Sequence, residues 1–470
     1  MTVPSFPFLL FALLAAAVYN LPGMERGRPL TLLAANLAFL FSFSSSATDL
    51  VPFAVFLSLG YSATALLARR GGPGLAALMI GLVLITFVWL KKYSFIPSDL
   101  WLRAPYVTVG LSYVFFRVMH LVVDAGQGDM EGPIPVLSYV NYCTNFLCLT
   151  AGPIQRYEDY AEQQAAPYLR PGADVMIEAA ERVLLGLFKV MVVSMLLLEQ
   201  HVGVVAMLTE PSANRMTTAL QVVLIYPLYL YANFSGYCDV VIALGRLFRL
   251  ELPENFNRPF SATNFIEFWS RWHITLSTWL KTYVFTPLMM RLMRLSDSPA
   301  AASGWSAFAF FVTFFLVGAW HGQTSEFLFF GVLQGGGVAA NKLYQTTMTQ
   351  ALGRKRYLAL AGNPIYAAIC RGLTFVWFGF TLLWFWSDWS TIGLLWTFLG
   401  PAGAAAAVIL AVALSAVVLE ILRMGRRAAE AWQTDRKYAR VAWASAQATM
   451  LWLVVSILAA PPPSIVYQAF

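Results

Sequence analysis

Long apolar runs recur along almost the whole 470-residue chain, and they restrict it to one class of structure. Hydrophobic residues make up 59% of the sequence and charged residues only 12%, which no ordinary soluble domain approaches. A helix needs about twenty apolar residues to cross a bilayer, and lipid-exposed backbone must satisfy its own hydrogen bonds. We therefore expect an all-α, polytopic membrane bundle with about 11–13 spans, plus re-entrant or in-plane helices.

The expected spans can be placed by hydropathy alone. They lie near residues 5–20, 30–46, 51–68, 74–91, 104–123, 176–198, 217–245, 304–320, 325–345, 363–386, 402–423 and 440–460. Three further runs, near 141–153, 262–290 and 389–400, are interrupted by proline, glycine or charge. Such interruptions are tolerated at membrane depth where protein shields the backbone, so these runs are the expected re-entrant or in-plane helices.

Basic residues between the spans predict the orientation, because cytoplasmic loops carry an excess of Lys and Arg. The flanking residues used are Arg26, Arg28, Arg69, Arg70 and a cluster between residues 423 and 440. They place both termini outside the cytoplasm, although Lys91 and Lys92 do not fit a simple alternation. The net charge of +7 is spread among these loops rather than gathered on one face, so we expect membrane lipids and no nucleic acid as partners.

Two histidines stand out inside this apolar background. His321 lies within an apolar segment from 307 to 332, and His273 lies in an aromatic stretch from 268 to 279. Ionisable side chains at membrane depth are rare and usually face a protein interior or a wet cavity. Asn264, with Glu267 three residues later, predicts a helix start, and one continuous helix would place His273 beside Ser277 on one face.

Several motifs around these histidines resemble the membrane-bound O-acyltransferase family, in its bacterial branch of teichoic acid D-alanylation and alginate or cellulose O-acetylation. They are Phe-Ser-Gly-Tyr at 234–237, Pro-Glu-Asn-Phe-Asn-Arg-Pro-Phe at 253–260, the Phe-Trp and Arg-Trp-His elements at 268–273, and Gly-Ala-Trp-His-Gly at 318–322. Ala-Gly-Pro-Ile-Gln-Arg at 151–156 matches another family element. The resemblance covers about residues 100–345 and implies a bundle with a central tunnel in a bacterial inner membrane.

The resemblance assigns the catalytic position to His321 and a lesser one to His273. Moving an acyl group from a thioester to a hydroxyl needs a base for the hydroxyl proton, and neutral imidazole suits that task near neutral pH. His321 is the expected base, and His273 would orient or polarise the donor. The alternative for each is a packing role, which for His273 is comparably supported.

Other residues near the histidines are expected to line the substrate tunnel. They are Trp320, Trp272, Ser277, Gly318, Gly322 and Asn255. Gly318 and Gly322 would leave room either for a substrate chain or for a close helix. His120 and His201 are interpreted as packing residues. We expect no metal site, because no His or Cys pair stands at ligand spacing.

The resemblance also implies the reaction partners. No bound cofactor is expected. The donor would be a phosphopantetheine thioester on an acyl carrier protein at the cytoplasmic face, or acyl-CoA. The acceptor would be a downstream extracytoplasmic acyltransferase or the polymer itself. D-alanyl is the leading acyl group, acetyl transfer to an exported polysaccharide or peptidoglycan is the alternative, and a transporter, flippase or non-catalytic scaffold is the rival of another class.

The C-terminal tail suggests an acyl relay. Three prolines at 461–463 favour an extended exit, and Tyr467 stands three residues before the terminal Phe470. This spacing resembles the tail of the small partner protein in teichoic acid D-alanylation. Tyr467 is therefore the hypothetical acyl acceptor, against the alternative of a disordered terminus. The expected division is residues 1–100 for N-terminal helices, 101–346 for the catalytic core, 347–438 for C-terminal helices, and 439–470 for the last span and tail.

Overall fold

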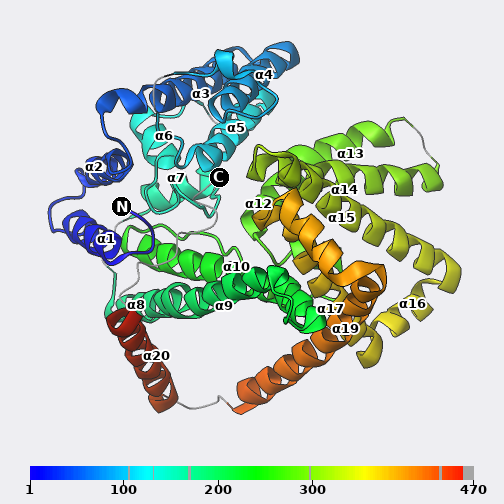
Figure 1. Ribbon diagram of the computed structural model, residues 1–470. Coiled ribbons are helices and arrows are strands. Elements are labelled where there is room, and N and C mark those ends of the chain that lie inside the picture. Colours follow the sequence, from blue (N-terminus) through cyan, green and yellow to red (C-terminus); the bar gives the residue numbers. More distant parts are fainter. Residues whose placement is uncertain (104–105, 131, 168–170, 296–297, 433–436, 459–470) are drawn as a thin grey trace. The chain divides into compact units, whose positions relative to one another are not determined.

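The computed structural model describes the chain apart from residues 104–105, 131, 168–170, 296–297, 433–436 and 459–470 (Figure 1). The described residues form helices joined by turns and loops. One isolated antiparallel β-bridge, between Phe256 and Trp272, is found among them. This confirms the prediction of an all-α polytopic membrane protein. Apolar length along the sequence was enough to predict it, because helices satisfy their backbone internally.

A helix forms at each of the predicted spans. Their bounds are α1 (Phe6–Tyr19), α2 (Arg28–Phe41), α3 (Val51–Arg70), α4 (Pro73–Leu90), α5 (Leu111–Gln127), α8 (Ala173–Phe188) continuing through a π-helical turn into α9 (Met195–Ala206), α10 (Arg215–Leu247), α14 (Pro299–His321), α15 (Ser325–Leu352), α17 (Pro364–Thr381), α19 (Trp389–Trp432) and α20 (Lys437–Leu458). Among the described residues, 6 helices are long and apolar enough to cross a membrane, and α1 and α2 are shorter apolar helices.

The interrupted run near 262–290 forms the short helices α11 (Phe265–Trp269), α12 (Ile274–Leu280) and α13 (Thr286–Met293), and the run near 141–153 begins at the end of α6 (Val136–Cys143). The other short helices are α7 (Tyr157–Ala165), α16 (Arg354–Ala361) and α18 (Leu383–Trp386). The run near 389–400 instead begins α19, which kinks at Gly400, where φ is +67°. Only glycine adopts that backbone conformation at little cost.

The chain divides into two compact units. Unit 1 holds residues 1–191, 233–254 and the segment from 447 onward, and unit 2 holds residues 192–232 and 255–446. Within unit 2, α14 packs along α15 and α17 packs along α19. These boundaries come from packing, and the predicted division into functional segments stays a prediction.

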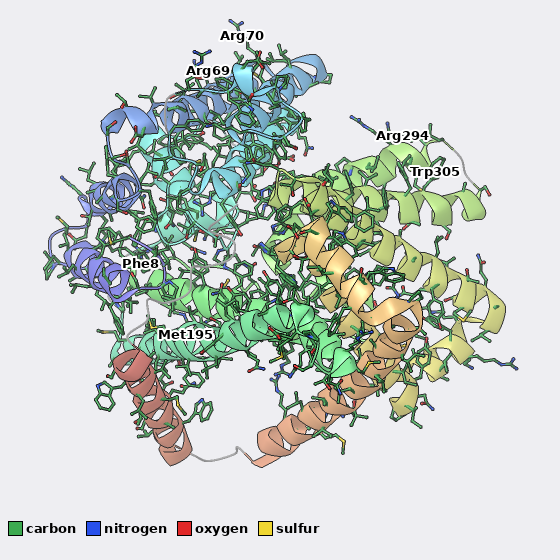
Figure 2. All side chains as sticks on the ribbon, viewed as in Figure 1. Phe8, Arg69, Arg70, Met195, Arg294 and Trp305 are labelled. Carbon is green, nitrogen blue, oxygen red and sulfur yellow. The ribbon has the colours of Figure 1, made fainter. Side chains whose placement is uncertain are left out.

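In unit 1, an apolar side chain is buried between helices and two arginines lie exposed at a helix end. Phe8 is fully buried on α1, while Arg69 and Arg70 project from the last turn of α3 (Figure 2). Basic side chains at a helix C-terminus interact favourably with its dipole and can reach polar surroundings. The arginine pair used to predict orientation is therefore exposed at a helix end.

Candidate functional site

His321 is the last residue of α14, and its imidazole is walled by aromatic rings. The side chain is buried, and Gly322 follows in an extended conformation that ends the helix. The imidazole centroid lies 4.6 Å from the Trp320 ring, 5.1 Å from the Phe385 ring on α18 and 6.1 Å from the Phe330 ring on α15. The ring is thus held in an apolar enclosure at the junction of three helices.

Trp320 connects the two predicted histidines. The Trp320 ring lies 6.4 Å from the His273 ring and 4.6 Å from the His321 ring, centroid to centroid. His273 is completely buried, and burial lowers its pKa to about 3. Unit 2 therefore brings both histidines to one indole, and His273 stays neutral at physiological pH.

The predicted single helix through residues 264–279 is wrong. α11 ends at Trp269, and His273 adopts a left-handed conformation (φ +44°, ψ +53°) as the residue before α12. A left-handed backbone is costly for most residues other than glycine, and it persists only where neighbouring structure imposes it. The break means that His273 and Ser277 do not share a helix face in the way the sequence suggested.

Asn255 accounts for the break. Its backbone oxygen accepts a hydrogen bond from the Ile274 N–H (3.0 Å), and its side-chain oxygen accepts one from the Thr275 hydroxyl (2.7 Å). The Asn257 N–H in turn donates to the Arg271 carbonyl (2.9 Å). Residues 255–257 are thus hydrogen-bonded to the chain just before and just after His273. Asn255 is fully buried, and these contacts make it a positioning residue, while its expected place in a tunnel wall stays a prediction.

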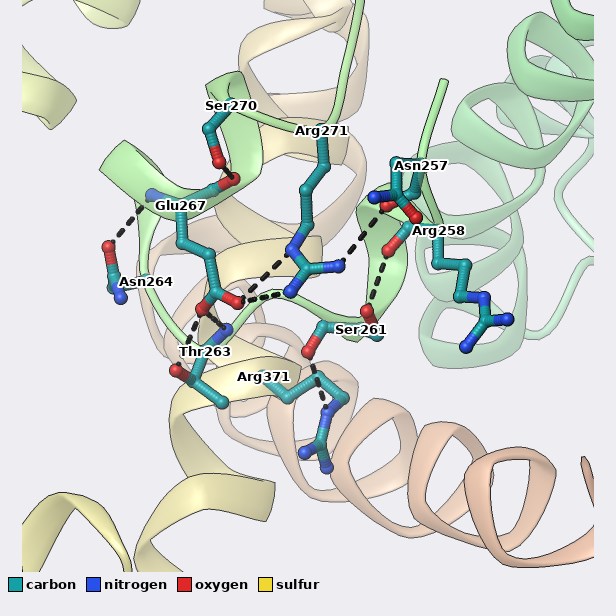
Figure 3. Close-up of polar contacts among 9 residues, drawn as sticks. All are labelled: Asn257, Arg258, Ser261, Thr263, Asn264, Glu267, Ser270, Arg271 and Arg371. Atoms are coloured by element: carbon teal, nitrogen blue, oxygen red, sulfur yellow. Dashed lines mark hydrogen bonds and ion pairs between the residues drawn. The ribbon is translucent and has the colours of Figure 1, made fainter. Parts of the chain in front are cut away.

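Helix α11 begins as the sequence predicted. The Asn264 side chain accepts the Glu267 N–H (2.9 Å), and Glu267 pairs with Arg271 four residues later (2.9 Å), as Figure 3 shows. The Glu267 carboxylate also accepts the Thr263 N–H (2.9 Å). Arg271 donates to the Asn257 carbonyl (3.3 Å), so this network anchors the chain on the N-terminal side of His273.

Gly318 and Gly322 serve close packing, one of the two roles considered for them. A Cβ at Gly318 would lie 2.4 Å from the Gly331 backbone of α15, and one at Gly322 would lie 2.0 Å from the Phe327 ring. Neither distance is possible for real atoms, so any larger side chain would push α15 away from α14. The space beside both glycines is filled by protein.

Trp272 and Ser277 have different surroundings. Trp272 is buried in an aromatic cluster, with ring centroids 4.8 Å from Phe378, 5.0 Å from Phe256 and 5.6 Å from Phe268. Ser277 lines a cavity of about 280 Å³ together with Lys281 and Thr313. Ser277 alone of this pair therefore borders an open space within unit 2.

Sequence reasoning missed the residues that wall His321 from the α15 and α18 sides. Phe385 and Phe330 had no distinguishing signal among 35 phenylalanines. A buried polar pair lies one helical turn from both rings. Gln334, four residues after Phe330 on α15, donates from its side-chain amide to the hydroxyl of Thr381 (2.8 Å), which lies four residues before Phe385. A lone glutamine in an apolar run was a usable signal, because buried polar groups need partners.

The remaining histidines lie apart from this pair. His120 in unit 1 lies 3.3 Å from the Phe116 carbonyl, and His201 in unit 2 packs against the Trp386 ring at 4.5 Å. Among the described residues, no three His, Cys, Asp or Glu side chains are grouped so that they could hold a metal ion. Tyr467 lies outside the described residues, so its predicted role is tested by no contact.

Comparison with known proteins decides the family. The model of the membrane-bound O-acyltransferase family matches residues 5–379, most of the chain. The chain belongs to this family. The resemblance found in the sequence motifs is thereby confirmed.

Three relatives carry names that state a polymer and the acyl group transferred to it. The chain is similar to the teichoic acid D-alanyltransferase of Bacillus subtilis, with 25% identity over 227 residues, 48% of this chain and 56% of that protein. It is similar to a probable alginate O-acetylase of Pseudomonas aeruginosa, with 28% identity over 48% of this chain and 41% of that protein. It is also 38% identical to the peptidoglycan O-acetyltransferase of Helicobacter pylori over 25% of this chain and 21% of that protein. The matches thus span at most a little over half of these relatives.

Proposed function

We propose that this chain is a membrane O-acyltransferase that passes a small acyl group from a cytoplasmic thioester to a hydroxyl for modification of a cell-envelope polymer. One observation carries the proposal, namely that two buried histidines from separate elements meet at Trp320. Family membership and the relatives' names support the reaction class. His321 acts as the base, and His273 orients the donor or polarises its carbonyl.

The proposed reaction uses both histidines in their neutral form. His321 takes the proton of the attacking hydroxyl while that oxygen forms a bond to the thioester carbonyl carbon. The carbon–sulfur bond breaks, and the leaving thiolate takes that proton from His321 to form the free thiol, which returns His321 to its neutral form. A neutral His273 offers an N–H to the carbonyl oxygen, where negative charge develops. The aromatic rings around His321 enclose this imidazole in apolar surroundings.

The leading donor is a D-alanyl thioester on an acyl carrier protein, and acetyl is the alternative acyl group. Relatives of both kinds are found, so the family alone favours neither. The C-terminal tail favours D-alanyl, since Tyr467 and Phe470 have the spacing of an acyl-accepting tail. In that scheme the Tyr467 phenol is acylated first, and the ester then passes to a later acceptor. A phenol is easier to deprotonate than an alcohol, and its ester is a better leaving group.

The test of the reaction class uses His321→Ala in membranes supplied with a labelled thioester donor. Loss of acyl-ester formation with a normally folded protein supports the acyltransferase. A transporter or flippase would keep partial flux and form no ester even in the unchanged protein. A non-catalytic scaffold would leave acyl transfer intact in the reconstituted complex. Either result would reject the proposal.

The relay has a separate test. Tyr467→Phe removes only the phenolic oxygen, so labelling of the protein by donor should disappear while the fold is unaffected. Tyr61→Phe is the control, because that hydroxyl donates to the Ile134 carbonyl and belongs to packing. Undiminished labelling of Tyr467→Phe would end the relay and leave direct transfer to the final acceptor.

A further inference from the structure

A second cavity lies in unit 2, and its lining includes none of His273, Trp320 and His321. It has a volume of about 570 Å³ and lies between α11, α15, α16 and α17. Gly336 and Gly337 line it on α15, and Trp377 of α17, whose indole packs directly against Gly337, lines it as well. No role in acyl transfer requires this cavity, and its surroundings point to a different ligand.

The cavity has a polar end formed by three tyrosines and an apolar opening along α17. Tyr344, Tyr357 and Tyr366 line the polar end, where the Tyr344 and Tyr366 hydroxyls are 2.7 Å apart. Ile369 and Leu373 follow Tyr366 on α17, line the cavity and are 51% and 53% exposed, so we infer that the opening beside them faces hydrocarbon in a membrane. Four polar side chains also line the wall, namely Thr263, Asn264, Asn341 and Thr374. The twelve residues from Tyr366 to Trp377 span roughly 16 Å of helix, close to one leaflet of a hydrocarbon core about 30 Å thick.

The charge at the polar end is strongly one-sided. Arg354, Lys355 and Arg356 are exposed and immediately precede Tyr357 at the start of α16, which follows α15 in Figure 1. No acidic residue occurs between 327 and 387. None of the three has an acidic partner among the side chains that the structure describes. Clustered Lys and Arg at a helix end beside a membrane attract anionic headgroups.

We propose that this cavity is a binding site for an anionic phospholipid, with an acyl chain along α15 and α17 and its phosphate against the basic start of α16. Tyrosines belong at the headgroup level, where an apolar ring and a polar hydroxyl are both satisfied. A lipid fits better than a soluble donor because the apolar stretch opens through exposed Ile369 and Leu373. The proposal does not depend on the acyl-transfer reaction.

Two sets of variants in the full chain separate the tail contacts from the headgroup contacts. Gly336 lines the cavity and a Cβ there would meet nothing within 4 Å, so Gly336→Leu is designed to occupy part of the cavity. Gly304→Leu is the matched control, since Gly304 is also helical with open space around it and lies outside the cavity. The triple variant Arg354→Gln, Lys355→Gln, Arg356→Gln removes the charges, and Arg69→Gln with Arg70→Gln removes an exposed basic pair elsewhere.

The readout is lipid retained after detergent purification and re-exposure to phosphatidylglycerol or phosphatidylcholine vesicles, measured by native mass spectrometry. The unchanged chain and Gly304→Leu should retain phosphatidylglycerol, and Gly336→Leu should retain at least about tenfold less. In the triple variant, the ratio of retained phosphatidylglycerol to retained phosphatidylcholine should fall by about fivefold for each charge removed. Thermal unfolding of each variant confirms that the fold is kept.

Three results would overturn the proposal. Equal retention by Gly336→Leu and Gly304→Leu would show that the cavity holds no lipid. Displacement by millimolar inorganic phosphate alone would identify a phosphate site rather than a lipid site. A raised KM for the thioester donor in Gly336→Leu, with lipid retention unchanged, would make the cavity a donor path. Because retention is measured without acyl transfer, failure of the proposed reaction leaves this test unaffected.

Discussion

Two parts of the molecule carry family motifs, and different kinds of described contact surround their polar side chains. In unit 1, the Tyr237 hydroxyl lies 3.1 Å from the carbonyl oxygens of both Leu147 and Gly152. Asp239 accepts Lys189 at 2.6 Å and Arg182 at 3.0 Å. In unit 2, the described contacts of the His273 and His321 imidazoles are with aromatic rings, and Trp320 lies beside both.

The difference teaches which motif builds the frame and which one carries the chemistry. A saturated polar network inside a protein rigidifies it, and removing a member costs stability. We expect the two imidazoles, which lie beside aromatic rings and one of which has a left-handed backbone, to exchange protons with a substrate. We therefore expect substitutions in unit 1 to lower stability and those around Trp320 to lower activity.

The largest expected effect is on the two histidines. His321→Gln should lower kcat for acyl transfer by about 10³-fold, since a general base contributes about 10²–10⁴-fold. His273→Gln should lower it by about tenfold. Burial holds the pKa of His273 near 3, so His273 does not change protonation between about pH 7 and 5. Any fall in activity over that pH range should therefore be the same in His273→Gln as in the unchanged protein. Equal kcat losses in the two variants would contradict the assigned roles.

The next effect concerns the contact between α14 and α15. Gly318→Val should destabilise the protein by about 1–3 kcal/mol and reduce activity, because its Cβ would collide with the Gly331 backbone. Thermal unfolding in detergent and the acyl-transfer assay measure the two effects. Gly304→Val, in open space on the same helix, should show neither. A fully stable Gly318→Val would mean that α15 can move without disturbing the wall of His321.

Asn255 gives a smaller effect that separates positioning from folding. Asn255→Ala removes the acceptor for Thr275, which should cost about 1–2 kcal/mol and lower kcat about tenfold with little change in KM. Asn255→Asp keeps an acceptor oxygen and should restore part of the rate. Asn264→Ala, the same substitution at the α11 cap, should cost about 1 kcal/mol with a smaller loss of kcat. Identical kcat values for the two alanine variants would remove Asn255 from the positioning of His273.

The smallest effect tests the frame. Tyr237→Phe should lower the free energy of unfolding by about 1 kcal/mol through the loss of one hydrogen bond, with kcat unchanged. Equilibrium unfolding and the transfer assay on the same preparation measure both. A large loss of kcat at unchanged stability would place Tyr237 in the chemistry and erase the contrast between the two motifs.

Sequence reasoning succeeded where the signal was local. Apolar length predicted the helices of the spans, and the Asn264 cap with the Glu267 to Arg271 pair depends on residues a few positions apart. It failed at His273, because the backbone reversal there is imposed by hydrogen bonds from Asn255. It also left open whether Gly318 faces substrate or helix, since only the position of Gly331 answers that question.

The sequence by itself determined that this chain is a helical membrane protein of the O-acyltransferase family and that His321 and His273 are its candidate reactive groups. Composition, span length and motif order are properties of neighbouring residues, so they can be read along the chain. Only the tertiary structure decided that both imidazoles meet at Trp320, that Asn255 fixes one of them, and that Phe385 encloses the other. Those relations join segments distant in sequence, and packing rather than local propensity sets them.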